Sequence, residues 1–148
     1  DHLRNYLLPR DCPRVTYYPV PTSTPEDVRR LIGPSGALHV VAIEAAWFER
    51  AYKGRLCIYE FCTDTFSALD PGAGYHISTV PVTPIGKRIV DRPLEELVSM
   101  GSELRVLTSL WPLCDVVVAS SLQFSCIRMR NAQPRAVVPA SVPEKGSS

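Results

Sequence analysis

The stretch from Leu38 to Gly54, LHVVAIEAAWFERAYKG, constrains the fold more than any other part of the chain. Its first half is an unbroken run of aliphatic and β-branched residues, which is typical of a strand buried on both faces. Its second half has apolar residues at helical spacing and ends at Gly54, a suitable residue for a helix C-terminus. The sequence therefore predicts a core strand that passes directly into an amphipathic helix.

Glu44 stands at the junction of this predicted strand and helix. A carboxylate in such a position can be held by backbone N–H groups and by the positive end of the helix dipole, which is a structural role. It can equally be displayed in a crevice at the end of a sheet, where α/β proteins place their chemistry. Glu44 is therefore a candidate catalytic or ribose-binding carboxylate with a structural alternative.

Length and composition indicate an ordinary globular chain. The 148 residues suffice for a single core, and 45% are hydrophobic and 21% charged. The formal net charge of +1 gives no electrostatic reason to expect DNA or an anionic membrane as a partner. No apolar run approaches the roughly 20 residues of a transmembrane helix. We expect a soluble, cytoplasmic protein, and the sequence leaves its oligomeric state open.

Strand and helix patterns alternate in short units. Strands are predicted at 14–20, 38–43, 56–61, 87–91 and 104–107, and helices at 25–33, 44–53 and 93–101. Residues 109–120 suit either a helix or a strand, and the spacing of their apolar residues favours a helix through Val118. Residues 124–129 are predicted to be helical.

These elements predict one α+β domain, with a mixed, mainly antiparallel sheet flanked by short helices. Prolines in the extended segments argue against a doubly wound parallel sheet. The domain is expected to cover residues 1–132, and the segment 133–148 is expected to be a disordered tail rich in proline and serine.

The five cysteines are odd in number and widely spread, and four of them lie inside apolar runs. Such cysteines are usually reduced core residues in a reducing compartment. No Cys-x-x-Cys pair exists and the three histidines are isolated, so no metal site is predicted.

Three further residues are candidates for binding or catalysis. Arg10 and Arg14 flank a turn stiffened by prolines, and the guanidinium fork matches the geometry of a phosphate. The alternative is a solvated charge cluster with Asp11. His76 follows a glycine-rich loop and could act as an acid or base near neutral pH, or it could be an exposed edge residue.

Three segments carry a family resemblance: NYLLPRDCPRVTYY at 5–18, GAGYHISTVPVTP at 72–84 and SLWPLCDVVVASSLQFSCIRMRNA at 109–132. They resemble a family of small, mostly bacterial proteins for which no activity is established. Members of that family usually begin with a further segment containing a Leu-Tyr-His-x-Ser type motif. Because this chain starts at Asp1 in what reads as the middle of an element, we expect a native N-terminal segment to be missing.

The opening of that family is similar to the early part of the ADP-ribosyltransferase and RNA 2′-phosphotransferase fold. This resemblance implies NAD as a possible cofactor, and it places Tyr6 at the aromatic position that packs against nicotinamide or adenosine. The late carboxylate of that superfamily has no counterpart here, because the matching place reads Tyr75-His76-Ile77-Ser78. The resemblance therefore fits a nucleotide-binding relative without activity as well as it fits an enzyme.

Three functions remain open from the sequence. The first is a nucleotide- or NAD-related transferase, or its inactive relative, with Tyr6, Arg10, Arg14, Glu44 and His76 around one crevice. The second is a non-catalytic interaction module that presents the helices at 93–101 and 109–130 to a partner protein. The third is a small-molecule hydrolase built on a carboxylate and a histidine.

Overall fold

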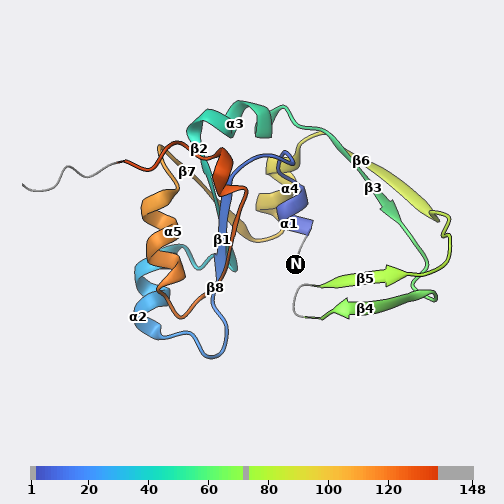
Figure 1. The fold of residues 1–148 in the computed structure, drawn as a ribbon, viewed down its shortest axis with the longest axis horizontal. Helices are drawn as coiled ribbons and strands as arrows, with labels where there is room; N and C mark the ends of the chain where they lie inside the picture. The colour runs from blue at the N-terminus through green and yellow to red at the C-terminus, as the bar shows by residue number, and fades with distance from the viewer. Residues whose placement is uncertain (1–2, 72–73, 137–148) are drawn as a thin grey trace, which may run out of the picture.

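The computed structural model describes residues 3–71 and 74–136 (Figure 1). The helical elements are α1 (Leu3–Tyr6), α2 (Pro25–Asp27), the π-helical η1 (Val28–Ile32), the 3-10 turn η2 (Gly33–Ser35), α3 (Ala45–Tyr52), α4 (Pro93–Ser99), α5 (Trp111–Val118) and the 3-10 turn η3 (Met129–Asn131). The strands are β1 (Arg14–Tyr18), β2 (His39–Glu44), β3 (Leu56–Glu60), β4 (Phe66–Asp70), β5 (Tyr75–Ser78), β6 (Gly86–Val90), β7 (Ser102–Leu107) and β8 (Gln123–Ile127). Most of the segment expected to be a disordered tail, residues 137–148, lies outside the described residues.

A four-stranded sheet in the order β7-β2-β1-β8 forms the centre of the molecule. Strand β1 runs antiparallel to both of its neighbours, whereas β2 and β7 are parallel. Two further pairs, β3 with β6 and β4 with β5, are antiparallel ribbons. The prediction of an α+β protein with mixed, mainly antiparallel pairing and short helices is confirmed.

Helices cover both faces of this sheet (Figure 1). Val40 and Ala42 of β2 face a core built with residues of η1 and α5, and Val41 and Ile43 face a second core built with residues of α3 and α4. Alternate residues of a strand point to opposite faces, so a central strand between two helical layers must be apolar throughout. This requirement explains the unbroken run VVAI at 40–43, and all four of these residues are at most 1% exposed.

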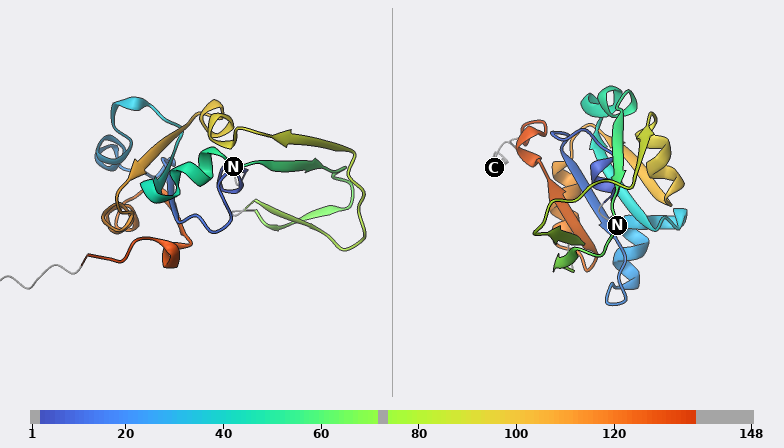
Figure 2. Two further views of the ribbon diagram at one scale, coloured as in Figure 1. Left: turned by 90° about the horizontal axis from the view of Figure 1, so that it is seen from above. Right: turned by 90° about the vertical axis from the view of Figure 1, so that its right-hand side faces the viewer.

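Residues 56–90 form an arm that projects from the central sheet (Figures 1 and 2). The β3–β6 ribbon leaves the body, and the β4–β5 ribbon brings the chain back towards α1. Only the base of the arm is packed: Val90 is 4% exposed and belongs to the second core, where Leu56 and Ile58 contact it. The arm is inserted in the crossover that connects the parallel strands β2 and β7.

Local signals place the α2 helix where the sequence predicts it. The side chain of Thr24 accepts a hydrogen bond from the backbone amide of Asp27 at 3.3 Å, and Pro25 occupies the first turn. Gly33, with a φ of 73°, ends the helical segment in a conformation that favours glycine. The helix favoured for residues 109–118 is also confirmed, as α5.

One predicted element is wrong, and two further features of the strands were not predicted. Residues 124–129 were expected to be helical, but most of them form β8, because pairing with β1 outweighs local preference. Strand β4 is not among the strands predicted from the sequence. Val106, in the predicted strand at 104–107, is 43% exposed, because β7 is the outer strand of its sheet.

Candidate functional site

A pocket of about 910 Å³ lies where the arm returns to the body, beside α1. Segments far apart in the sequence line it: residues 5–10 with Arg14, residues 49–50 and 53–56, Tyr75 of β5, Pro93 at the start of α4, and Ile127 with Arg128 at the end of β8. The volume is in the range of small-molecule sites. We call it the Tyr6 pocket.

Arg14 is buried in the wall of the Tyr6 pocket and holds the turn before β1 in place. Its Nε donates to the carbonyl of Cys12 at 3.1 Å, and its Nη2 donates to the carbonyls of Pro9 and Arg10, both at 3.2 Å. Its Nη1 donates to the carbonyl of Asn5. Burial lowers the pKa of this guanidinium. Because backbone carbonyls take up most of its donors, Arg14 positions the pocket wall more than it offers a free anion site.

Two tyrosine rings, of Tyr6 and Tyr75, stand at the pocket and are 61% and 47% exposed. Their side chains are hydrogen-bonded to each other, and this bond, together with partial burial, raises the pKa of Tyr6. The contact joins α1 to the first residue of β5 and so connects the body to the returning ribbon of the arm. Aromatic faces at the mouth of a pocket can stack on a planar ligand group.

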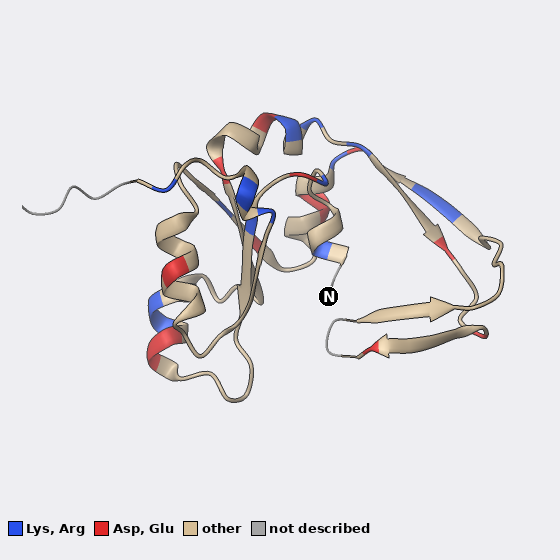
Figure 3. Ribbon diagram, in the orientation of Figure 1, with Lys and Arg blue, Asp and Glu red and all other residues tan. Residues whose placement is uncertain are grey.

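Within the described part of the chain, the charged side chains that line the Tyr6 pocket are mostly positive: Arg10, Arg14, Arg50, Lys53, Arg55 and Arg128, against the carboxylate of Glu49. Figure 3 shows part of this group in blue at the end of α3 and in the segment that leads to β3.

Two of the pocket's cations are neutralised by acidic neighbours. Lys53 pairs with Glu49 at 2.6 Å and Arg55 pairs with Asp91 at 2.7 Å. In contrast, Arg10, Arg50 and Arg128 have no acidic partner among residues 3–71 and 74–136. The guanidinium of Arg50 lies over the ring of Trp47 at 4.7 Å, an arrangement that leaves its charge uncompensated. The pocket therefore carries a positive field that an anion could neutralise.

Glu44 lies away from the pocket and is 1% exposed. Its Oε1 accepts a hydrogen bond from the backbone amide of Leu110 at 3.1 Å, and its Oε2 accepts one from the amide of Gln133 at 2.9 Å. It makes no side-chain cap on α3, the helix that follows it. Both oxygens thus hold two distant chain segments against the end of β2.

His76 lies on the exposed ribbon of the arm and does not line the Tyr6 pocket, although the preceding residue does. Adjacent residues of a strand point to opposite faces, which separates the His76 ring from that of Tyr75. Its Nδ1 is 3.4 Å from the carbonyl oxygen of Gly74. Of the five residues singled out from the sequence, the structure brings Tyr6, Arg10 and Arg14 together and leaves Glu44 and His76 outside.

Sequence reasoning missed Arg50 and Arg128 as pocket residues. The basic run Arg50, Lys53 and Arg55 at the end of the predicted helix was a usable signal for one side of the pocket. Arg128 had no such signal, because only the pairing of β8 with β1 brings it to Arg10, whose carbonyl its Nε approaches at 3.4 Å.

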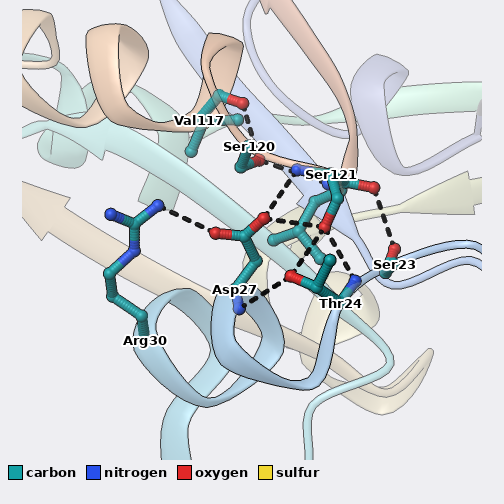
Figure 4. Close-up of polar contacts among 8 residues, drawn as sticks. Ser23, Thr24, Asp27, Arg30, Val117, Ser120 and Ser121 are labelled. Atoms are coloured by element: carbon teal, nitrogen blue, oxygen red, sulfur yellow. Dashed lines mark hydrogen bonds and ion pairs between the residues drawn. The ribbon is translucent and has the colours of Figure 1, made fainter.

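A second polar cluster ties α2 to the turn between α5 and β8 (Figure 4). The Oδ2 of Asp27 accepts hydrogen bonds from the amide and the hydroxyl of Ser121 at 2.8 and 2.7 Å. The Ser121 hydroxyl in turn accepts from the backbone amide of Thr24 at 2.8 Å. These hydrogen bonds of Ser121 and Asp27 tie the N-terminus of α2 to the turn before β8, so we interpret the cluster as a structural clamp.

Neither metal ligation nor membrane crossing has support in the part of the chain that the structure describes. Residues 3–71 and 74–136 hold no cluster of three or more His, Cys, Asp or Glu side chains suited to a metal ion. No helix within these residues is both long enough and apolar enough to cross a membrane.

Comparison with known proteins gives a family without a stated activity. No curated protein and no solved structure matches the chain. A family of unknown function, DUF6886, matches residues 1–132. That match covers most of the 148 residues, but it gives no support for the resemblance to ADP-ribosyltransferases. The chain belongs to this family of unknown function, DUF6886.

Proposed function

We propose that the protein binds a phosphorylated nucleotide, with NAD among the candidates, in the Tyr6 pocket. The observation that carries this proposal is the grouping of Arg10, Arg50 and Arg128, without acidic partners in the described residues, around a pocket that also presents Tyr6 and Tyr75. Guanidinium groups suit phosphate oxygens, and the aromatic rings suit a base or a nicotinamide.

The proposed activity is binding, with no catalytic role assigned to Glu44 or His76. Glu44 is buried with both oxygens accepting from backbone amides, and His76 lies outside the pocket lining. A transferase that stabilises an oxocarbenium-like transition state needs a carboxylate beside the ribose. Among residues 3–71 and 74–136, Glu49 supplies the one carboxylate that lines this pocket, and it is paired with Lys53. We therefore propose a binding relative of the ADP-ribosyltransferases that lacks their catalytic groups.

Calorimetric titration with AMP, ADP-ribose, NAD and uncharged adenosine tests the proposal. We expect the phosphorylated ligands to bind and adenosine to bind at least tenfold more weakly. Arg10→Ala should weaken binding of the phosphorylated ligands by about 10- to 150-fold, equivalent to roughly 1.5–3 kcal/mol for a hydrogen bond to a charged group. Arg29→Ala is the matched control, because Arg29 is exposed on η1 and does not line the Tyr6 pocket.

Two results would contradict the proposal: no heat with any phosphorylated ligand, or equal losses in Arg10→Ala and Arg29→Ala. Equal affinity for adenosine and AMP would show that the cations do not contact the ligand. The melting temperature of each variant, measured without ligand, verifies that a loss of binding is not a loss of folding.

The second candidate function is a protein-interaction module, and the arm is the observation that favours it. Large apolar side chains are exposed along it: Tyr59, Phe61, Leu69, Ile77, Val80, Val82, Ile85 and Ile89. Exposed apolar patches on ribbons with free edges often mark interaction sites. If the arm is such a site, Leu69→Ser with Ile77→Ser should abolish co-purification of a partner and leave AMP binding unchanged.

A further inference from the structure

The thiols of Cys114 and Cys126 lie directly against each other. The two Sγ atoms are 2.9 Å apart, one in α5 and the other in β8. The two residues belong to or pack against the same core, on the face of the sheet that α5 covers. The turn that connects the two elements is fixed by the hydrogen bonds from Ser121 to Asp27, so the chain brings the two sulfur atoms together before any bond forms.

We propose that Cys114 and Cys126 are a dithiol that a small-molecule disulfide, such as oxidised glutathione, converts into an intramolecular disulfide between α5 and β8. The observed separation exceeds the 2.05 Å of a disulfide bond by only about 0.9 Å, which small rotations about the two Cα–Cβ bonds can close. The proposal concerns this pair alone, and both cysteines are free thiols in the structure.

The other three cysteines lie in other parts of the fold and are not positioned to form a disulfide with either member of this pair. Cys12 is fully buried in the second core, on the opposite face of the sheet. Cys57 is in β3, and Cys62 is an exposed residue that follows β3, so both belong to the arm. This arrangement predicts that oxidation selects the pair in α5 and β8.

The reaction is an ordinary thiol–disulfide exchange. One cysteine thiolate attacks a sulfur of oxidised glutathione, forms a mixed disulfide and releases one glutathione thiolate. The second cysteine attacks the protein sulfur of that mixed disulfide and releases the second glutathione. The two protein thiols are oxidised, one oxidised glutathione becomes two reduced molecules, and these take up the two thiol protons.

The surroundings of the pair make the exchange slow at neutral pH. Burial, a hydrogen bond with Cys114 and the charge of Asp115 raise the pKa of Cys126 to about 12. Asp115 itself pairs with Arg135 at 2.6 Å, and the residue of β1 opposite Cys126 is the uncharged Val15. Because the thiolate is the attacking species, we expect the rate of oxidation to rise with pH between 7 and 9.

Mass spectrometry of one tryptic peptide gives the test. The protein is equilibrated with buffers of increasing oxidised-to-reduced glutathione ratio, alkylated and digested without reduction. Trypsin cleaves after Arg105 and Arg128 and leaves both cysteines in the peptide 106–128. The proposal expects this peptide to become two hydrogen atoms lighter and free of alkyl groups, and to return to the dithiol form with a reductant.

The variants separate this pair from the other thiols. In Cys62→Ser the peptide should still oxidise as in the original chain, whereas Cys114→Ser should leave Cys126 alkylated or joined to glutathione. The proposal is overturned if the peptide of the original chain keeps two alkylatable thiols at every ratio. It is equally overturned if either of these cysteines is found bonded to Cys12, Cys57 or Cys62. The first readout uses the original chain and does not depend on whether a variant folds.

Discussion

The Glu44 carboxylate accepts a hydrogen bond from the backbone amide of Leu110, a residue 66 positions later, at 3.1 Å. This contact fixes the start of α5 at the end of β2, and the second carboxylate oxygen fixes Gln133 at the same place. A charged acceptor that is 1% exposed needs such donors, because an unpaired buried carboxylate is costly. The junction carboxylate is thus a structural tie between three chain segments.

Replacing Glu44 with Gln should lower the free energy of unfolding by about 1–3 kcal/mol. The amide keeps one acceptor, but its NH2 group faces a backbone N–H and leaves that donor unsatisfied. Urea denaturation measures the loss. Glu49→Gln is the control, because Glu49 is exposed and pairs with Lys53 on the surface, and its effect should stay within about 0.5 kcal/mol. Equal effects of the two substitutions would refute the structural role.

Arg14→Lys should destabilise the fold, and Arg10→Lys should not. The guanidinium of Arg14 donates to four backbone carbonyls, and an ammonium group cannot reach all of them. We expect a loss of about 2–3 kcal/mol in the free energy of unfolding for Arg14→Lys. Arg10 is exposed, so its replacement should change stability by less than about 0.5 kcal/mol. Chemical denaturation of both variants measures these changes. An unchanged free energy of unfolding for Arg14→Lys would contradict the structural role of Arg14.

Asp27 should make the stability of the fold depend on pH in the acidic range. Hydrogen bonds from the amide and hydroxyl of Ser121 hold the pKa of Asp27 below its usual value. The folded-state pKa therefore lies below the unfolded-state pKa, so this stabilisation is fully present above the unfolded-state value and is lost as the pH falls through the folded-state value. Asp27→Asn should lower the melting temperature at pH 7, and its difference from the original chain should shrink towards pH 3.

The control for Asp27 is Glu26→Gln, an exposed neighbour in the same helix. Melting temperatures recorded between pH 7 and pH 3 should show a constant, small difference for that variant. A difference between Asp27→Asn and the original chain that does not change with pH would mean that the carboxylate charge is not what Ser121 stabilises.

His39 should make the stability of the fold depend on pH in a second, less acidic range. Burial, together with the nearby Arg4, lowers the pKa of His39 to about 4, and its ring packs 4.3 Å from that of Tyr18. Neither ring nitrogen has a hydrogen-bond partner in the described residues. The unfolded chain takes up this proton near pH 6.5, so the stabilisation is complete above that value and declines as the pH falls towards 4.

His39→Phe should therefore flatten the fall in melting temperature between pH 6.5 and pH 4. His76→Phe is the matched control, since His76 is exposed on the arm and its replacement should leave the slope unchanged. Thermal unfolding followed by circular dichroism at pH 7.5, 5.5 and 4.5 provides the comparison. An identical slope in His39→Phe and the original chain would contradict the buried neutral state of His39.

Local chemistry explains which parts of the fold were predictable. The run before Glu44 predicts β2, and Thr24, Pro25 and Gly33 define the ends of the α2–η1 helical segment. Residues 124–127 were wrongly predicted to be helical because their strand exists through pairing with β1, more than a hundred residues earlier, and no local residue preference encodes that pairing.

The residues of the candidate site also fall into two groups, those that the local sequence identified and those that it did not. Tyr6, Arg10 and Arg14 were recognisable because they sit within one short, proline-stiffened segment. Arg50 and Arg128 come from the end of α3 and the end of β8, and they meet the first group only through the topology of the sheet. Glu44 was correctly placed at the strand–helix junction, but the two amides that it binds come from distant segments that the sequence could not identify.

The arm also changes the order in which the chain can fold. To pair β2 with β7, residues 45–101 must close into a loop, and parallel pairing gains nothing until that loop has closed. If the β3–β6 ribbon forms first, Leu56 is already opposite Val90, and only residues 45–55 and 91–101 remain to be ordered. Shortening the effective loop in this way lowers the entropic cost of closure by about 1 kcal/mol. The inserted arm can thus speed formation of the central sheet while contributing only its base to the core.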